Sequence, residues 1–203
     1  FFSRIGFDKP LFTELPEVNP PNVPPEFSEV VAATASFGHG FSISPLHMAR
    51  ALAAFVNGGY LLTPTFYPRS QAEALAQATR VISQATSDRL RYLLRLNAVT
   101  GSGTRMNAVA AGYRVGGKTG TAEKVVNGRY GTGKNLNVFV TAFPMENPRF
   151  VMLVMVDEAE PENPQSGNTA GWNAGEVSGR IIARVAPMLG VAPDALEPLE
   201  RAL

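Results

Sequence analysis

The sequence predicts an α/β protein of the α+β type, in which helices flank an antiparallel sheet. Apolar residues recur at helical spacing in several segments before residue 110 and again after residue 173. Between these segments, two β-branched and aromatic runs are separated only by a short turn, and strands joined so closely pair antiparallel. A length of 203 residues, 45% of them hydrophobic, suits one domain or a large part of one.

The first part of the chain, residues 1 to 110, should be a wrapping loop followed by helices. Six prolines fall within residues 1 to 30, where they remove backbone donors and disfavour helix. A helix should then run from Ser44, a good N-cap before Pro45, to the stop signal Gly58.

Two more helices are expected before the sheet. The first is short and covers Gln71 to Ala78. The second should begin at Ser87, because leucines follow it on one helical face. The sequence TGSGT at residues 100 to 104 should end this helix, since its glycines break the pattern.

Residues 111 to 157 should form a three-strand antiparallel meander. The expected strands are residues 113 to 126, 135 to 143 and 149 to 157. NGRYGTG and PMENP are rich in turn residues and should connect them. Met152 and Met155 lie in the last strand and are expected to pack in the core. The remainder, residues 158 to 203, should be a polar loop, a last helix from Asn173 to Leu189 and a tail.

The composition argues against several classes of function. The net charge is +1 and the basic residues are scattered, so no nucleic-acid surface is expected. There is no cysteine, and His39 and His47 are isolated from other ligand-type residues, so we expect neither a metal nor another cofactor. No run approaches the roughly 20 apolar residues that span a bilayer. Because FFSRIGFDKP has neither an initiator Met nor a signal-peptide layout, the numbering should begin inside a longer protein.

One stretch, AGYRVGGKTGTAEK at residues 111 to 124, satisfies two catalytic patterns that need different structures. Gly112, four residues and Gly117-Lys118-Thr119 fit the phosphate-binding loop. FVMLVMVDE at residues 150 to 158 resembles the apolar strand of P-loop enzymes that ends in an acidic residue and holds magnesium. The overlapping Lys118-Thr119-Gly120 fits the catalytic pattern K-T-G instead.

The residues after Lys118 favour the K-T-G interpretation. A phosphate-binding loop needs a helix directly after its lysine, because the helix N-terminus supplies N–H groups for the phosphates. Gly120, followed by Val125 and Val126, disfavours such a helix. A K-T-G motif needs an extended strand that presents a lysine, hydroxyls and a backbone N–H to an acyl substrate, and these residues suit a strand.

Ordered segments along nearly the whole chain resemble the transpeptidase domain of class B penicillin-binding proteins, most closely the division-specific, FtsI-type members. The matching segments are FFSRIGFDKPLFTELPE, ATASFGHGFSISPLHMARALAAFVNGG, YRVGGKTGTAEK, VTAFPMENPRFVMLVMVDE and the last helix. The resemblance implies the penicillin-binding transpeptidase and serine β-lactamase-like fold, with a five-stranded antiparallel sheet between helices. The implied reaction is peptidoglycan cross-linking by serine acyl transfer.

The resemblance also implies roles for the motif residues. Lys118 would order the serine-lysine network and favour an anionic substrate terminus. Thr119 and Thr121 would offer hydroxyls to the terminal D-Ala carboxylate, and the backbone N–H of Thr121 would form half of the oxyanion hole. Gly120 would keep the strand open for a substrate that lies alongside it, and Gly171 would lie at the rim of the substrate site.

The sequence departs from the family pattern in two places. It contains no Ser-x-x-Lys motif, and its Ser-x-Asn, Ser166-Gly167-Asn168, comes after K-T-G and is read as coincidence. Gly175-Glu176 stands where the family usually has Ala-Pro. We therefore expect residues 1 to 203 to be the C-terminal portion of a single transpeptidase domain. The nucleophilic serine and the general-base lysine would lie outside it, so the fragment alone should be inactive.

The partners implied are peptidoglycan stem peptides ending in D-Ala-D-Ala, β-lactams, and division-complex proteins that include a membrane glycosyltransferase. The implied location is the periplasmic face of the bacterial cytoplasmic membrane, with the membrane anchor outside this fragment. Two alternatives remain open at this point. One is a non-catalytic transpeptidase-like domain that acts only in assembly, and the other is a P-loop nucleotide-binding module.

Overall fold

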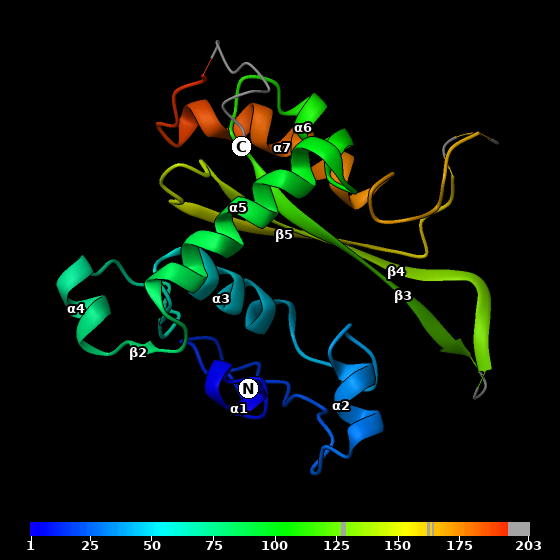
Figure 1. Cartoon of the computed structure of the whole chain (residues 1–203), viewed down its shortest axis with the longest axis horizontal. Coiled ribbons are helices and arrows are strands. Elements are labelled where there is room, and N and C mark those ends of the chain that lie inside the picture. The colour runs from blue at the N-terminus through cyan, green and yellow to red at the C-terminus, as the bar shows by residue number, and fades with distance from the viewer. Residues whose placement is uncertain (127–128, 162, 164, 195–203) are drawn as a thin grey trace.

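The computed structural model describes residues 1–126, 129–161, 163 and 165–194, and its centre is a three-stranded antiparallel sheet between helices (Figure 1). The strands are β3 (Gly116–Val126), β4 (Arg129–Phe143) and β5 (Phe150–Asp157), adjacent in that order. The predicted antiparallel meander and the α+β class are therefore confirmed.

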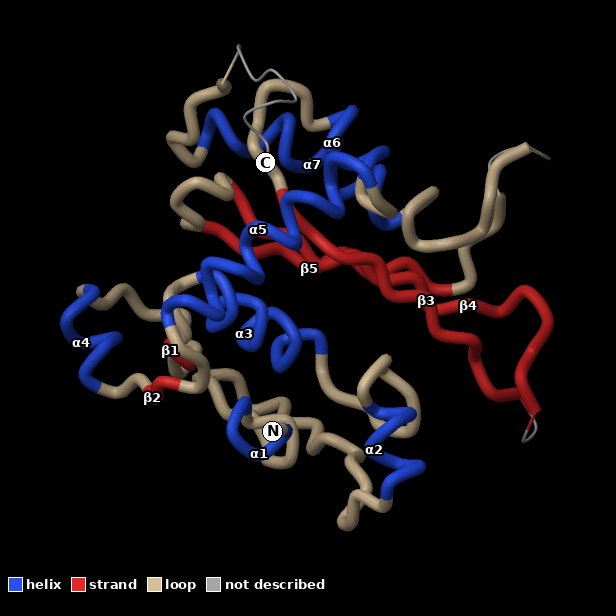
Figure 2. The backbone as a smooth tube through the Cα atoms, viewed as in Figure 1, coloured by secondary structure: helices blue, strands red, loops and turns tan. Residues whose placement is uncertain are grey.

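Helices cover both faces of this sheet (Figure 2). The helices around the sheet are α3 (Pro45–Val56), α5 (Gln84–Thr100), α6 (Thr104–Val109) and α7 (Ala174–Met188). Of these, α3, α5 and α7 contact its strands, and α6 packs against α5 and α7. α7 packs on one face together with α6, whereas α3 packs on the other. α5 runs beside β3 and contacts both α3 and α6. No described helix is both long and apolar enough to cross a membrane.

The strand boundaries differ from the prediction at two points. β3 begins at Gly116 rather than at residue 113. β4 begins at Arg129, so most of NGRYGTG extends the strand instead of forming a turn. The first two residues of NGRYGTG, 127 and 128, lie outside the described residues. The two strands therefore form a long ribbon that reaches beyond the helices (Figure 1).

The main core lies between the sheet and the helices α5, α6 and α7, and Phe139 of β4 is at its centre. The Phe139 side chain is fully buried. A Cβ at Gly117 would lie only 2.4 Å from its Cε1 atom, and one at Gly175 would lie 3.1 Å from Cδ2. The missing side chains at these glycines thus make room for the phenyl ring between β3 and α7.

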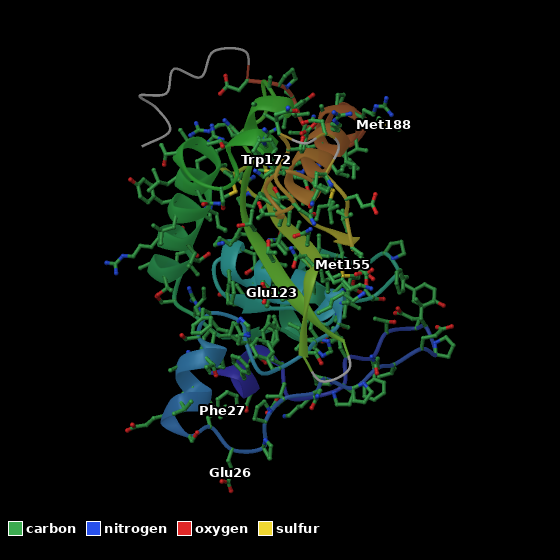
Figure 3. All side chains as sticks on the ribbon, turned by 90° about the vertical axis from the view of Figure 1, so that its right-hand side faces the viewer. Glu26, Phe27, Glu123, Met155, Trp172 and Met188 are labelled. Carbon is green, nitrogen blue, oxygen red and sulfur yellow. The ribbon has the colours of Figure 1, made fainter. Side chains whose placement is uncertain are left out.

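The opposite face of the sheet has a smaller core under α3. Its buried members are Leu52, Val56, Val140, Ala142 and Met145. Met152 of β5 packs against the main core, as predicted. The prediction for Met155 is wrong, because its side chain is 48% exposed, and Figure 3 shows it at the surface.

The N-terminal part contains short helices that were not predicted from its proline-rich sequence. They are α1 (Phe2–Ile5) and α2 (Glu29–Ala35). α2 contains the β-branched pair Val30-Val31, which has a weak helix propensity, but Ser28 caps it by accepting a hydrogen bond from the Val31 N–H. Phe2 stacks edge-on against Phe7 and Phe41, and these rings tie the wrapping segment to the loop before α3.

The expected helices after residue 43 are present, with one corrected start. α3 has the predicted cap, because Ser44 Oγ accepts from the His47 N–H. α4 (Gln71–Ala76) lies between the short strands β1 (Tyr60–Leu61) and β2 (Thr79–Arg80). α5 begins at Gln84, capped by Ser83, rather than at Ser87. Ser87 is buried inside the helix, where its hydroxyl donates to Phe55 O at 2.7 Å.

His47 is a structural histidine of the α3 core. Its side chain is 2% exposed, its Nε2 lies 2.9 Å from Lys9 O, and its Nδ1 lies 2.7 Å from Ser44 Oγ. Both ring nitrogens therefore have partners: Nε2 attaches the wrapping segment to α3, and Nδ1 bonds to the N-cap residue of α3.

An ion cluster connects the three strands at their outer end. Lys124 Nζ of β3 lies 3.0 Å from an Asp157 oxygen and 2.8 Å from a Glu158 oxygen. Lys134 Nζ of β4 lies 3.5 Å from the other Glu158 oxygen. The hydrogen bond from Lys124 lowers the pKa of Glu158, and the bonds to Glu158 and Asp157 raise the pKa of Lys124.

Acidification should weaken the fold through this cluster. Because the folded-state pKa of Glu158 is lowered, its stabilising contribution is complete above the ordinary glutamate pKa of about 4.3 and is lost as the pH falls through the folded value. We expect Lys124→Met to lose less thermal stability than wild type between about pH 5 and pH 3. Thermal unfolding at several pH values measures this effect, with Lys9→Met, at another exposed lysine, as control. Parallel curves for wild type and Lys124→Met would contradict it.

Candidate active site

The stretch with two motif interpretations enters β3 at Gly116, so Gly117-Lys118-Thr119 lies within the strand. Lys118 and Thr119 are paired with Val140 and Phe139 of β4, and the strand continues to Val126. No helix follows the lysine, so this segment lacks the helix N-terminal N–H groups that bind phosphate in a P-loop. The connection to β5 is an antiparallel hairpin rather than a helical crossover. The geometry excludes the P-loop arrangement for this segment.

Side chains of β3 alternate between the two faces of the sheet. Lys118 shares a face with Gly116, which contacts Met145 on the α3 side. Thr119 and Thr121 share the face of Phe139, on the side of α6 and α7. Lys118 is exposed, and its Nζ reaches around the strand to donate to Thr119 O at 2.8 Å and Thr119 Oγ1 at 3.2 Å.

The backbone N–H of Thr121 points to the open edge of the sheet. β3 pairs only with β4 among the described strands, so its other side is free. Gly117 O accepts from the side chain of Asn97 at 2.8 Å, and Asn97 belongs to α5 beside β3 rather than to β4, so the polar groups of residue 117 are directed away from β4. In an antiparallel strand the N–H and C=O of one residue point to the same side, and those of the residue two positions later point to that side again. Thr121 therefore presents its N–H to the free side.

The hydroxyls of the motif line a pocket of about 320 Å³. Its described lining is Ser102, Thr104, Arg105, Thr119, Thr121, Thr169, Ala170, Gly171 and Trp172. None of these lining residues is acidic, and most carry a hydroxyl. We call this cavity the motif pocket. Neutral hydroxyls and one cation suit a carboxylate ligand, because each can donate a hydrogen bond to it.

The loop before α7 closes one side of the motif pocket. Ala170 N donates to Thr121 Oγ1 at 3.2 Å, which attaches the loop to β3. A Cβ at Gly171 would lie 3.0 Å from Ser102 O and 3.8 Å from Thr119 Cγ2. The structure thus places Gly171 directly against Thr119, together with the other predicted site residues.

The sequence does not indicate two residues at this site, namely Ser102, which lines the motif pocket, and Asn97, which bonds to Ser102. The sequence TGSGT predicts only the end of a helix, yet Ser102 Oγ lies 2.9 Å from Thr119 Oγ1. Asn97 Oδ1 accepts from the N–H and the hydroxyl of Ser102, both at 3.2 Å. Asn97 thereby joins this loop to β3. The only sequence signal was a serine between glycines shortly before the motif strand.

Arg105 and Trp172 form the rim shared with a second pocket of about 250 Å³. The Arg105 guanidinium stacks on the indole, with Cζ 3.4 Å from a ring centroid, and its Nη1 lies 3.5 Å from Glu176 Oε2. Glu176 also pairs with Arg180 at 2.6 Å. The Glu176 that departs from the family pattern thus lies in the first turn of α7 and holds Arg105 in place. Figure 3 shows Trp172 near the upper end of the molecule, where Met188 of α7 is also labelled.

The Ser-x-Asn sequence at residues 166 to 168 is in the loop before α7 and is not among the residues that line the motif pocket. Ser166 lines the second pocket rather than the motif pocket. Asn168 O accepts weak hydrogen bonds, at 3.5 Å, from the side chains of Asn135 and Asn137 on β4. Asn137 is fully buried below the loop, so these contacts position the backbone that carries Gly171.

The fold and the site have the features of the penicillin-recognising class of domain, because an edge strand bearing Lys-Thr-Gly-Thr lies beside a hydroxyl-lined pocket and the last helix. Comparison with known families identifies the family directly. Residues 1–183 match the family model described as penicillin binding protein transpeptidase domain. The chain belongs to this family.

Individual relatives agree with this assignment. The chain is 36% identical over 199 residues to the probable peptidoglycan D,D-transpeptidase FtsI of Caulobacter vibrioides, covering 94% of this chain and 34% of that protein. It is 37% identical over 175 residues to the stage V sporulation protein D of Bacillus subtilis, covering 81% of this chain and 26% of that protein. The chain thus spans about a third or less of these two curated relatives.

A solved structure supports the same fold. The transpeptidase domain of penicillin-binding protein 3 from Burkholderia pseudomallei, in its apo form, superimposes with a TM-score of 0.84 at 30% sequence identity. The match covers 97% of this chain and 58% of that chain.

Proposed function

We propose that the protein containing this chain is a D-Ala-D-Ala transpeptidase that cross-links peptidoglycan and is a target of β-lactams. The observation that carries the proposal is the open edge of β3. There the N–H of Thr121 faces outward beside the hydroxyls of the motif pocket, in a chain whose relatives include proteins named peptidoglycan D,D-transpeptidases. Such an edge can bind an extended peptide as an added strand.

The proposed reaction uses a serine and a general-base lysine from the part of the protein outside residues 1–203. The serine oxygen attacks the penultimate D-Ala carbonyl and loses its proton to the base. The terminal D-Ala then leaves as its amine, taking a proton, and the acyl-enzyme passes its peptide to the amine of a neighbouring stem peptide. The Thr121 N–H supplies half of the oxyanion hole in both steps.

The remaining motif residues bind and order the substrate in this proposal. Lys118 orders the serine-lysine network, and the hydroxyls of Thr119 and Thr121 donate to the terminal carboxylate. A Cβ at Gly120 would meet no protein atom closer than 3.9 Å, so packing within the chain does not require glycine there. Gly120 instead leaves space for the substrate strand, and Gly171 closes the pocket against Thr119.

The cellular setting extends this proposal. The whole chain would be the C-terminal portion of one transpeptidase domain on the periplasmic face of the cytoplasmic membrane, with the membrane anchor elsewhere in the protein. It would act in septal wall synthesis with division proteins, among them a membrane glycosyltransferase. The match to a protein named FtsI supports this role.

Labelling with a fluorescent penicillin separates this function from a non-catalytic role in assembly. We expect the complete protein to form a covalent adduct that survives denaturation and that unlabelled benzylpenicillin prevents. The isolated fragment of residues 1–203 should remain unlabelled, because it lacks a Ser-x-x-Lys motif. If the complete, folded protein also remains unlabelled, the non-catalytic alternative replaces the proposal.

A further inference from the structure

Ser102 and Asn97 continue the hydrogen-bond network of the motif beyond β3. Lys118 Nζ donates to Thr119 Oγ1 at 3.2 Å, Thr119 Oγ1 lies 2.9 Å from Ser102 Oγ, and Ser102 Oγ lies 3.2 Å from Asn97 Oδ1. The Asn97 amide is held in one orientation, because its Nδ2 donates to Gly117 O at 2.8 Å. The network therefore begins at a group that only donates and ends at an atom that only accepts.

These fixed ends determine where the hydroxyl protons point in the empty pocket. The Ser102 proton is directed to Asn97 Oδ1, so Ser102 Oγ can only accept from Thr119. The Thr119 proton is then directed at Ser102 rather than into the pocket. A carboxylate needs donors, so Thr119 must turn its proton away from Ser102 before it can bind one.

The release of Ser102 from Asn97 leaves no buried group without a partner. Asn97 Oδ1 also accepts from the backbone N–H of Ser102 at 3.2 Å, so it keeps this bond when the hydroxyl turns away. Ser102 is exposed at the wall of the motif pocket, and Gly171 packs against its carbonyl, which fixes the position of its backbone. Both hydroxyls can therefore rotate toward the same ligand.

We infer that Ser102 is a further carboxylate-binding residue of the motif pocket and that Asn97 is the positioning residue that holds it beside Thr119. When a terminal carboxylate binds, the hydroxyl groups of Ser102 and Thr119 both rotate. Each then donates a hydrogen bond to the carboxylate oxygens. This inference rests on the proposed transpeptidase function. It adds to the carboxylate site of that function a hydroxyl from outside the motif strand and the residue that positions it.

The test compares acylation of the complete protein by benzylpenicillin and by its uncharged methyl ester. Ser102→Thr and Ser102→Val have the same shape but differ in the hydroxyl. We expect Val to lower the second-order acylation rate constant for benzylpenicillin about tenfold, the size of one lost hydrogen bond to a charged group. The rate constant for the ester should stay at the wild-type value, and Thr should stay near wild type with both probes.

Thr100→Ala is the control, since its hydroxyl lies in the same region but bonds to Leu96 O within α5. Its rate constants should equal those of wild type. Equal losses of Ser102→Val with benzylpenicillin and with the ester would mean that the hydroxyl only supports the fold, and unchanged values with both would mean that it does not bind the carboxylate. Either result overturns the inference. A wild-type protein that reacts with neither probe would overturn the proposed function itself, and this inference with it.

Discussion

Replacement of Lys118 by alanine should lower penicillin acylation of the complete protein by about a hundredfold or more, the effect of removing one preorganised electrostatic contact at a reacting centre. Lys118 has no carboxylate partner among the described contacts, and its ammonium reaches the open edge of β3 beside Thr119. Its removal should therefore cost the reaction much and the fold little. Stopped-flow acylation and thermal unfolding measure the two effects separately.

Lys124 provides the matched control for this experiment. It is on the same strand, but it pairs with Asp157 and Glu158 at the outer end of the sheet. Lys124→Ala should acylate at the wild-type rate. If Lys118→Ala kept the wild-type rate constant, or if both variants lost activity equally, the role assigned to the motif lysine would be wrong.

Replacement of Phe139 by alanine should produce the largest loss of stability, about 3–5 kcal/mol, as for other fully buried phenylalanines. The ring is fully buried at the centre of β4. It fills the space that Gly117 and Gly175 leave open between β3 and α7, so its removal leaves a cavity that the strands cannot easily close. The midpoint of thermal or urea unfolding of the complete protein measures this loss.

Phe66→Ala is the control for the loss of a phenyl ring as such. The Phe66 side chain is 65% exposed, so its removal should change stability by less than about 0.5 kcal/mol. A Phe139→Ala protein that unfolded at the same midpoint as Phe66→Ala would contradict the packing described for the main core.

The elements that could be predicted are those whose local signals agree with the tertiary structure. Ser44 and Pro45 mark the start of α3 in the sequence and in the fold, and the two apolar runs around PMENP form the β4–β5 hairpin. α2 could not be predicted, because its β-branched residues follow a proline-rich segment and only its cap at Ser28 favours a helix. The sequence predicts a helix start at Ser87, because it does not reveal that the Ser87 hydroxyl is buried against Phe55.

The residues of the site also fall into those that local sequence signals predict and those that only tertiary packing brings together. The position of Lys118, Thr119 and Thr121 on an extended strand could be predicted, because a local strand pattern and a motif coincide. Ser102 and Arg105 could not, because their proximity to the motif depends on how α5 ends and how α6 packs against α7. Contacts of this kind join segments that carry no mutual signal in the sequence. Tertiary packing, rather than any local preference, brings them together.

The structure of the complete protein acylated by benzylpenicillin tests the central claim most directly. The account predicts an ester to a serine outside residues 1–203, with its carbonyl oxygen about 2.7–3.1 Å from the Thr121 nitrogen. The penicillin carboxylate should contact the Thr119 hydroxyl in the motif pocket. An ester to a serine within residues 1–203, or a carbonyl oxygen held by donors other than β3, would contradict the account.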